Sequence, residues 1–161
     1  MSDGAGTMPS ERPEWADLKE RIKKHEGFVN KIYKDSLGKA TIGYGHLITE
    51  DDTYEEGLEY SEDLLSRQFD VDFDRSFLNA RDLMEKYDLP VLPHPAQEVL
   101  IEMVFQLGIG GVGKFKKMWA ALEQGDFVEA SDQMMDSRWH QQTTNRCEDL
   151  AGRMAACAIP T

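Results

Sequence analysis

Residues 61–84 lie in the longest stretch of the chain without glycine or proline, and they constrain the fold most. Within this stretch the apolar residues Leu65, Phe69, Phe73 and Phe77 recur every four positions. Side chains at this spacing share one face of a helix, so the pattern predicts a single amphipathic helix. At ~1.5 Å per residue the helix is roughly 35 Å long, which is enough to join two lobes.

The segments on either side of this helix have different patterns. Short β-prone runs between residues 28 and 49, interrupted by glycine-containing turns, predict a small antiparallel sheet of two or three strands. After the helix, prolines break the chain and residues 99–107 form a nearly continuous apolar run, typical of a buried helix. Glycines at 108–113 predict a turn, and further helices are predicted at 114–124, at 127–135 and from about residue 145.

These patterns predict an α+β, mostly helical fold, in which a small lobe with a short antiparallel sheet is joined by a long helix to a larger all-helical lobe. We expect a single domain over residues 1–161, since a chain of this length builds one core. Its expected parts are a flexible tail (1–12), a small α+β lobe (25–60), the connecting helix (61–85) and a helical lobe (13–24 and 86–161). Cys147 and Cys157 would lie ~15 Å apart on one helix, so both are expected to be free thiols.

The charge of the chain is acidic and unevenly distributed. Thirty Asp and Glu oppose eighteen Lys and Arg, a net charge of −12, and residues 49–103 alone carry −12. Residues 1–48 carry +1 and residues 104–161 carry −1. General nucleic-acid binding needs a basic surface and is not expected. No apolar run approaches the ~18 residues of a membrane span, and the polar start carries no secretory signal, so we expect a soluble protein without membrane insertion.

Two carboxyl groups at nearby positions suggest acid–base chemistry. Glu26 continues the apolar stripe of a helix that begins near Pro13, and partial shielding from water favours its neutral form. Asp35 lies in a turn where we expect it to be solvated and ionised, and Thr41 follows on the next strand. Singly, these residues suit a helix end, a turn and a strand. Together, a proton donor and an anion are what glycosidic bond cleavage requires.

The spacing of Glu26, Asp35 and Thr41, followed by Ile-Gly-Tyr-Gly-His at 42–46, closely resembles the catalytic segment of the phage-type lysozymes, glycoside hydrolase family 24. Residues 101–108 and 137–146 resemble two helical-lobe signatures of that family, in the same order. The similarity spans about residues 18–154 and fits the lysozymes of T-even phages best.

The resemblance implies an endo-acting N-acetylmuramidase that hydrolyses the β-1,4 bond between N-acetylmuramic acid and N-acetylglucosamine in bacterial peptidoglycan. Glu26 would be the general acid, Asp35 the nucleophile or a stabilising anion, and Thr41 would position the attacking water. The implied enzyme is bacteriolytic and monomeric and needs neither a cofactor nor a metal; a phage lysin and an animal defence or digestive lysozyme both fit. The alternative is a catalytically weak or silent cell-wall-binding protein on the same scaffold.

The resemblance also implies roles for residues outside the catalytic segment. Four positions match substrate contacts of the family: Leu47, Phe105, Met118 and Gln133. Arg146 would pair with Glu26, and His46 would pair with an acidic residue on the connecting helix, for which Asp70 is the candidate. Glu102 stands where the family suggests a neutral amide. Since the segments expected to form the cleft are nearly neutral, we expect sugar contacts rather than charge to carry binding.

Overall fold

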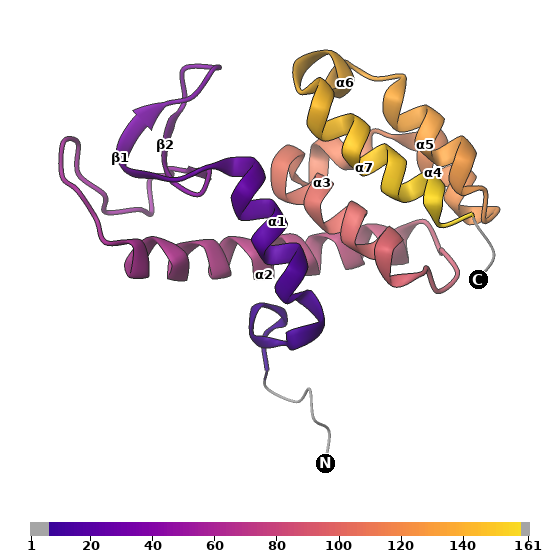
Figure 1. Ribbon diagram of the computed structural model, residues 1–161, viewed down its shortest axis with the longest axis horizontal. Coiled ribbons are helices and arrows are strands. Elements are labelled where there is room, and N and C mark those ends of the chain that lie inside the picture. The colour runs from indigo at the N-terminus through magenta and orange to yellow at the C-terminus, as the bar shows by residue number, and fades with distance from the viewer. Residues whose placement is uncertain (1–6, 159–161) are drawn as a thin grey trace. The chain divides into compact units, whose positions relative to one another are not determined.

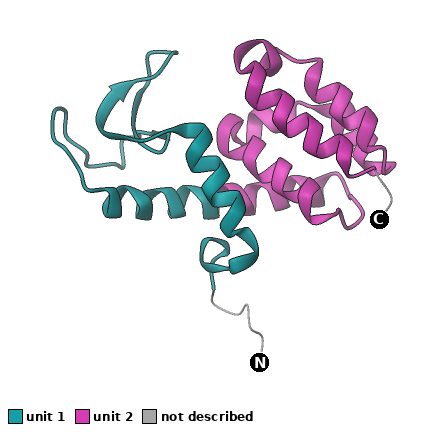
Figure 2. Cartoon of the chain, in the orientation of Figure 1, with its two compact units in different colours: residues 1–75 teal, residues 76–161 magenta. Residues whose placement is uncertain are grey.

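The computed structural model describes residues 7–158, and its contacts divide the chain into two compact units, residues 1–75 and 76–161 (Figure 2). The predicted long helix is present as α2, Glu62–Lys86, and the boundary between the units falls within it. Within residues 7–158, seven α-helices and one three-stranded sheet confirm the predicted α+β, mostly helical fold. No helix among residues 7–158 is long and apolar enough to cross a membrane.

The first unit combines one helix with the sheet (Figure 1). Its elements are 3-10 turns at Pro9–Glu11 and Pro13–Trp15, helix α1 (Ala16–Glu26), strands β1 (Val29–Lys34), β2 (Ala40–Gly43) and β3 (His46–Leu47), and the start of α2. The strands are antiparallel in the order β1-β2-β3. The apolar faces of α1, β2 and α2 build the core, in which the largest fully buried side chains are Leu18, Ile22, Ile42, Leu65, Phe69 and Phe73.

The structure corrects part of the predicted tail. Residues 1–6 lie outside the described residues, but Pro9–Glu11 forms a 3-10 helix with Pro9 buried. Ser10 donates two hydrogen bonds to Asp74, from its backbone N at 2.8 Å and from its hydroxyl at 2.9 Å. Ser10 is therefore bound to α2, and the helix predicted at 13–24 belongs by its contacts to the first unit.

The second unit is helical. After α2 it contains α3 (His94–Gly113), α4 (Lys116–Glu123), α5 (Phe127–Met135), α6 (Arg138–Gln142) and α7 (Thr144–Ala156). Helix α5 packs against α4 and α7, and α3 also contacts α7 (Figure 1). The predicted turn at 108–113 is a kink at Gly108, whose φ of 79° interrupts α3, after which the helix resumes. Helix α6 was not predicted, because five residues are too few to show a helical period.

Buried aromatic and sulfur-containing side chains hold the second unit together. The Trp119 ring stacks on Tyr87 with centroids 5.0 Å apart, and its indole N–H donates to the Val112 carbonyl at 3.0 Å. Both cysteines are free, as predicted. Cys147 is buried among these helices, and burial raises the pKa of its thiol to about 11, so it is an inert core residue.

Candidate active site

The sheet of the first unit places two predicted site residues, Thr41 and Leu47, in one row with Tyr33. Thr41 of β2 pairs with Tyr33 of β1 on one side and with Leu47 of β3 on the other. Directly opposite residues of antiparallel strands project from the same face of a sheet. Tyr33, Thr41 and Leu47 therefore share one face. Thr41 is 2% exposed, and its hydroxyl donates to the Lys39 carbonyl at 2.9 Å.

The β1–β2 turn fixes Asp35. Its Oδ1 accepts hydrogen bonds from the backbone N–H groups of Leu37 and Lys39, both at 2.9 Å. Gly38 has a φ of 79° and donates its N–H to the Asp35 carbonyl, which closes the turn. A turn aspartate commonly accepts such bonds, so the predicted solvated turn is also a rigid holder for this carboxylate. The second oxygen, Oδ2, accepts no hydrogen bond from these groups.

Glu26 is the last residue of α1 and is half-buried. The helix ends there because Gly27 adopts a φ of 73° and its N–H turns back to the Lys23 carbonyl at 2.9 Å. The backbone of Gly45 lies directly against the carboxyl group: a Cβ at Gly45 would overlap Oε1 and would lie 2.9 Å from Cδ of Glu26. Gly45 itself has a φ of 74°. Glycine at 45 therefore leaves the space that the Glu26 carboxyl occupies.

Tyr33, which was not predicted as a site residue, lies within electrostatic range of both carboxyl groups. Burial raises the pKa of the Tyr33 hydroxyl, and the negative charges of Glu26 and Asp35 raise it further. Both carboxyl groups thus act on one phenol that stands beside Thr41. The Tyr33 hydroxyl makes no hydrogen bond to residues 7–158. No local pattern singled out Tyr33, because its place beside Thr41 comes from the register of β1 and β2.

His46 pairs with the connecting helix as predicted, but the predicted partner was wrong. Its Nδ1 lies 2.8 Å from Asp72, and its Nε2 lies 2.9 Å from Asp52. Asp70 instead forms an ion pair with Lys19 at 2.8 Å. Two residues rotate a helix by about 200°, so Asp70 and Asp72 face opposite sides of α2. Among the described residues no group of three or more His, Cys, Asp and Glu side chains could hold a metal ion.

The charges around His46 reinforce one another. Burial disfavours the imidazolium, but the hydrogen bonds and negative charges of Asp72 and Asp52 outweigh burial and raise the pKa of His46. Burial likewise opposes the Asp52 carboxylate, yet the Thr49 N–H and the His46 ring lower the pKa of Asp52. The cluster anchors the end of β3 to α2 and is a structural ion-pair network.

Arg146 forms an ion pair within its own unit. Its Nε donates to Glu102 at 3.1 Å, and the Glu102 side chain has 0% exposure. The carboxylate that replaces the expected amide is therefore matched by a cation, which buried carboxylates require. The pairing of Arg146 with Glu26 stays a prediction.

The remaining predicted substrate contacts divide between the units. Leu47 is 47% exposed at the end of the sheet row. Phe105 lies half-buried in α3. Met118 and Gln133 line one pocket of the second unit, but Met118 is fully buried, so it forms a wall without exposed surface. Gln133 is half-buried and donates to Glu129 at 2.6 Å. Their contacts with substrate stay predictions.

Comparison with known proteins agrees with this geometry. Residues 23–156 match the family described as Phage lysozyme. Two proteins of Dictyostelium discoideum, Probable T4-type lysozyme 1 and Probable T4-type lysozyme 2, are each 29% identical, over 81% of this chain and 89% of theirs. The Pre-baseplate central spike protein Gp5 of Enterobacteria phage T4 is 31% identical over 80% of this chain but only 26% of its own. The family match covers most of the chain, including Glu26, Asp35 and Thr41, and the chain therefore belongs to the phage lysozyme family.

Proposed function

We propose that this chain is a muramidase that hydrolyses the β-1,4 bond between N-acetylmuramic acid and N-acetylglucosamine in bacterial peptidoglycan, and thereby lyses bacterial walls. One observation carries the proposal: the match to the phage lysozyme family covers Glu26, Asp35 and Thr41, and the fold holds the Glu26 carboxyl against Gly45 and the Asp35 carboxylate on two backbone N–H groups. Two carboxyl groups near one sugar-facing surface are the minimum that glycoside hydrolysis needs.

Glu26 is the proposed general acid. Its protonated carboxyl donates a proton to the leaving glycosidic oxygen as the bond to the anomeric carbon breaks. The close Gly45 backbone restricts where this carboxyl can lie, and Gly27 fixes the end of the helix that carries it. A positioned acid of this kind contributes about 10²–10⁴-fold to rate.

Asp35 and Thr41 serve the other half of the reaction. The Asp35 carboxylate stabilises positive charge on the anomeric carbon and takes up the proton of the attacking water. The Thr41 hydroxyl donates to the Lys39 carbonyl, which leaves its lone pairs to accept a hydrogen bond from that water. Two backbone N–H groups hold Asp35 in place, so little reorganisation is needed during the reaction.

Replacing Glu26 by Gln tests the acid role. Gln keeps the shape of the side chain and removes the acidic proton, so lysis of purified walls should fall about 10²–10⁴-fold while the midpoint of thermal unfolding is retained. Glu14→Gln, an exposed change of the same charge in the same unit, is the matched control and should lyse normally. Normal lysis by Glu26→Gln would overturn the assignment.

The alternative, a silent wall-binding protein, makes a different prediction. Such a protein would bind purified peptidoglycan without clearing a wall suspension, and its behaviour would be the same with Glu26 or Gln at position 26. A turbidity assay combined with sedimentation of the walls separates the two functions.

A further inference from the structure

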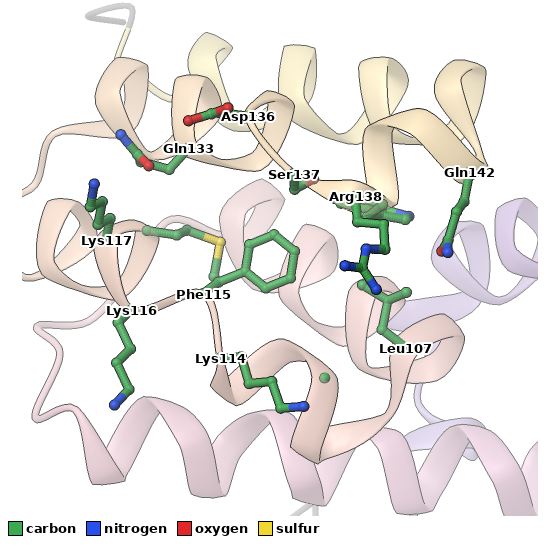
Figure 3. A pocket seen from close by; sticks show the side chains of 13 residues that line it. Leu107, Lys114, Phe115, Lys116, Lys117, Gln133, Asp136, Ser137, Arg138 and Gln142 are labelled. Atoms are coloured by element: carbon green, nitrogen blue, oxygen red, sulfur yellow. The ribbon is translucent and has the colours of Figure 1, made fainter.

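The second unit contains a pocket of about 610 Å³ whose lining residues all lie between 107 and 142 (Figure 3). Its apolar wall includes Leu107, Phe115 and Trp139, with the Phe115 ring edge-on to Trp139 at 6.1 Å. The volume is within the range of about 300–1,000 Å³ that small-ligand sites occupy.

Four cations surround this pocket, although the chain as a whole is acidic. Lys114, Lys116, Lys117 and Arg138 line it, and Asp136 is the one acidic residue among the lining side chains. These four are half of the eight Lys and Arg in residues 76–161, a segment that also carries twelve Asp and Glu. All four are exposed, and none forms an ion pair with any residue in 7–158. Other arginines of this unit do pair with acidic neighbours.

The cations come from two separate elements. A lysine run such as 114–117 is ordinarily a solvated surface, but Arg138 reaches the same pocket from the start of α6. Arg138 is exposed and makes no ion pair with the described residues. The fold therefore brings unmatched positive charge together from distant parts of the sequence.

The four charges do not converge on one point. In Figure 3 the Lys116 and Lys117 side chains point in opposite directions at one end of the pocket, Lys114 lies below the Phe115 ring, and Arg138 lies beyond that ring. A single small anion cannot contact all four groups in this arrangement. A chain with repeating negative charges can contact them in succession.

We propose that this pocket binds a polyol phosphate polymer, in which phosphodiester links join the repeating units and each unit carries one negative charge. Lys ammonium and Arg guanidinium groups bind phosphate oxygens through charge-assisted hydrogen bonds, and the Phe115 face accommodates the uncharged part of a repeat. This inference rests on the proposed function for the source of the polymer, a bacterial wall that carries phosphodiester chains beside its peptidoglycan, and the pocket also contains Met118 and Gln133, two of the predicted substrate contacts.

The direct test is a calorimetric titration of the whole 161-residue chain with poly(glycerol phosphate). It is carried out at low and at moderate ionic strength. The double variant Lys114→Gln/Lys117→Gln should bind about fivefold more weakly for each charge removed, and the loss should shrink as salt screens the charges. Arg81→Gln, an exposed residue of the same unit outside the pocket, is the matched control and should bind as the unmodified chain does. The midpoint of thermal unfolding should be the same in the double variant, in Arg81→Gln and in the unmodified chain, since the replaced residues make no ion pairs with the described residues.

Three results would overturn the inference. One is no binding of poly(glycerol phosphate) by the unmodified chain, and another is an equal loss in the Arg81→Gln control. The third is equal affinity for poly-L-glutamate, which would replace phosphodiesters by carboxylates as the ligand. Hydrolysis of peptidoglycan from which the phosphodiester polymers have been removed is measured alongside. Failure of hydrolysis with intact polymer binding rejects the proposed function alone, whereas intact hydrolysis without polymer binding rejects the pocket alone.

Discussion

Replacing Gly45 by Ala separates the position of the proposed acid from the stability of the fold. The new Cβ would overlap Oε1 of Glu26 and lie 2.9 Å from its Cδ, which is closer than two carbon atoms approach without a shift. The contacted atoms are the end of a flexible side chain, so the carboxyl moves by about 1 Å at small energetic cost. A misplacement of this size costs about 10²-fold in rate.

A second cost of this substitution affects stability alone. Ala at a φ of 74° adopts the left-handed region, which costs about 1–2 kcal/mol. Gly57 provides the matched control: its φ is 80°, and a Cβ there meets no atom within 4 Å. Gly45→Ala and Gly57→Ala should therefore lose similar free energies of unfolding in urea.

The two variants should differ in activity. Initial rates of wall lysis are measured at a temperature where both variants are folded. The rate should fall about 10²-fold in Gly45→Ala and should stay within about twofold of the unmodified chain in Gly57→Ala. Equal activities at equal stabilities would show that the Gly45 backbone does not set the position of Glu26. A much larger loss of the free energy of unfolding in Gly45→Ala than in Gly57→Ala would show that the Glu26 carboxyl cannot move aside at small energetic cost.

Three further predictions follow from the buried charges and from Tyr33. Arg146→Met leaves the Glu102 carboxylate without its cation in a site of 0% exposure, so the free energy of unfolding in urea should fall by about 3–5 kcal/mol. Adding Glu102→Gln should recover part of this loss. A loss below about 1 kcal/mol in Arg146→Met would contradict the prediction. Tyr33→Phe should change the free energy of unfolding by less than about 1 kcal/mol, since the hydroxyl makes no hydrogen bond to residues 7–158. The same variant should lower the rate of lysis about tenfold. An unchanged rate would exclude Tyr33 from the site. The raised pKa of His46 means that its ion pairs stabilise the fold below the ordinary value of 6.5 and stop doing so as pH rises through the raised pKa. Asp72→Asn should therefore destabilise the chain more at pH values below 6.5 than in alkaline solution, and NMR titration should show a lower pKa for His46.

Local sequence patterns predicted the elements that depend on local periodicity. The four-residue ladder from Leu65 to Phe77 determined α2 to within two residues at each end, because a long helix without Gly or Pro has one stable solution. The turn at Asp35 was also predicted, since turns need particular residue types. Helix α6 was not predicted, because its formation depends on tertiary packing of Trp139 and on the Ser137 cap.

The sequence predicted the composition of the site better than its contacts. Its spacing indicated Glu26, Asp35 and Thr41, but the choice between Asp70 and Asp72 depends on the rotation of α2 against the sheet, which periodicity does not specify. The same holds for the pocket, since nothing in the lysine run indicates that Arg138 lies beside it. Contacts between residues distant in sequence come from the packed structure.

The most direct test of the account is chemical analysis of the products from purified peptidoglycan. If Glu26 protonates the glycosidic oxygen that links N-acetylmuramic acid to the following N-acetylglucosamine, the unmodified chain should release fragments with new reducing N-acetylmuramic acid ends. Glu26→Gln should release these fragments about 10²–10⁴-fold more slowly. Reducing N-acetylglucosamine ends, or no new reducing ends while the walls are bound, would contradict the muramidase assignment.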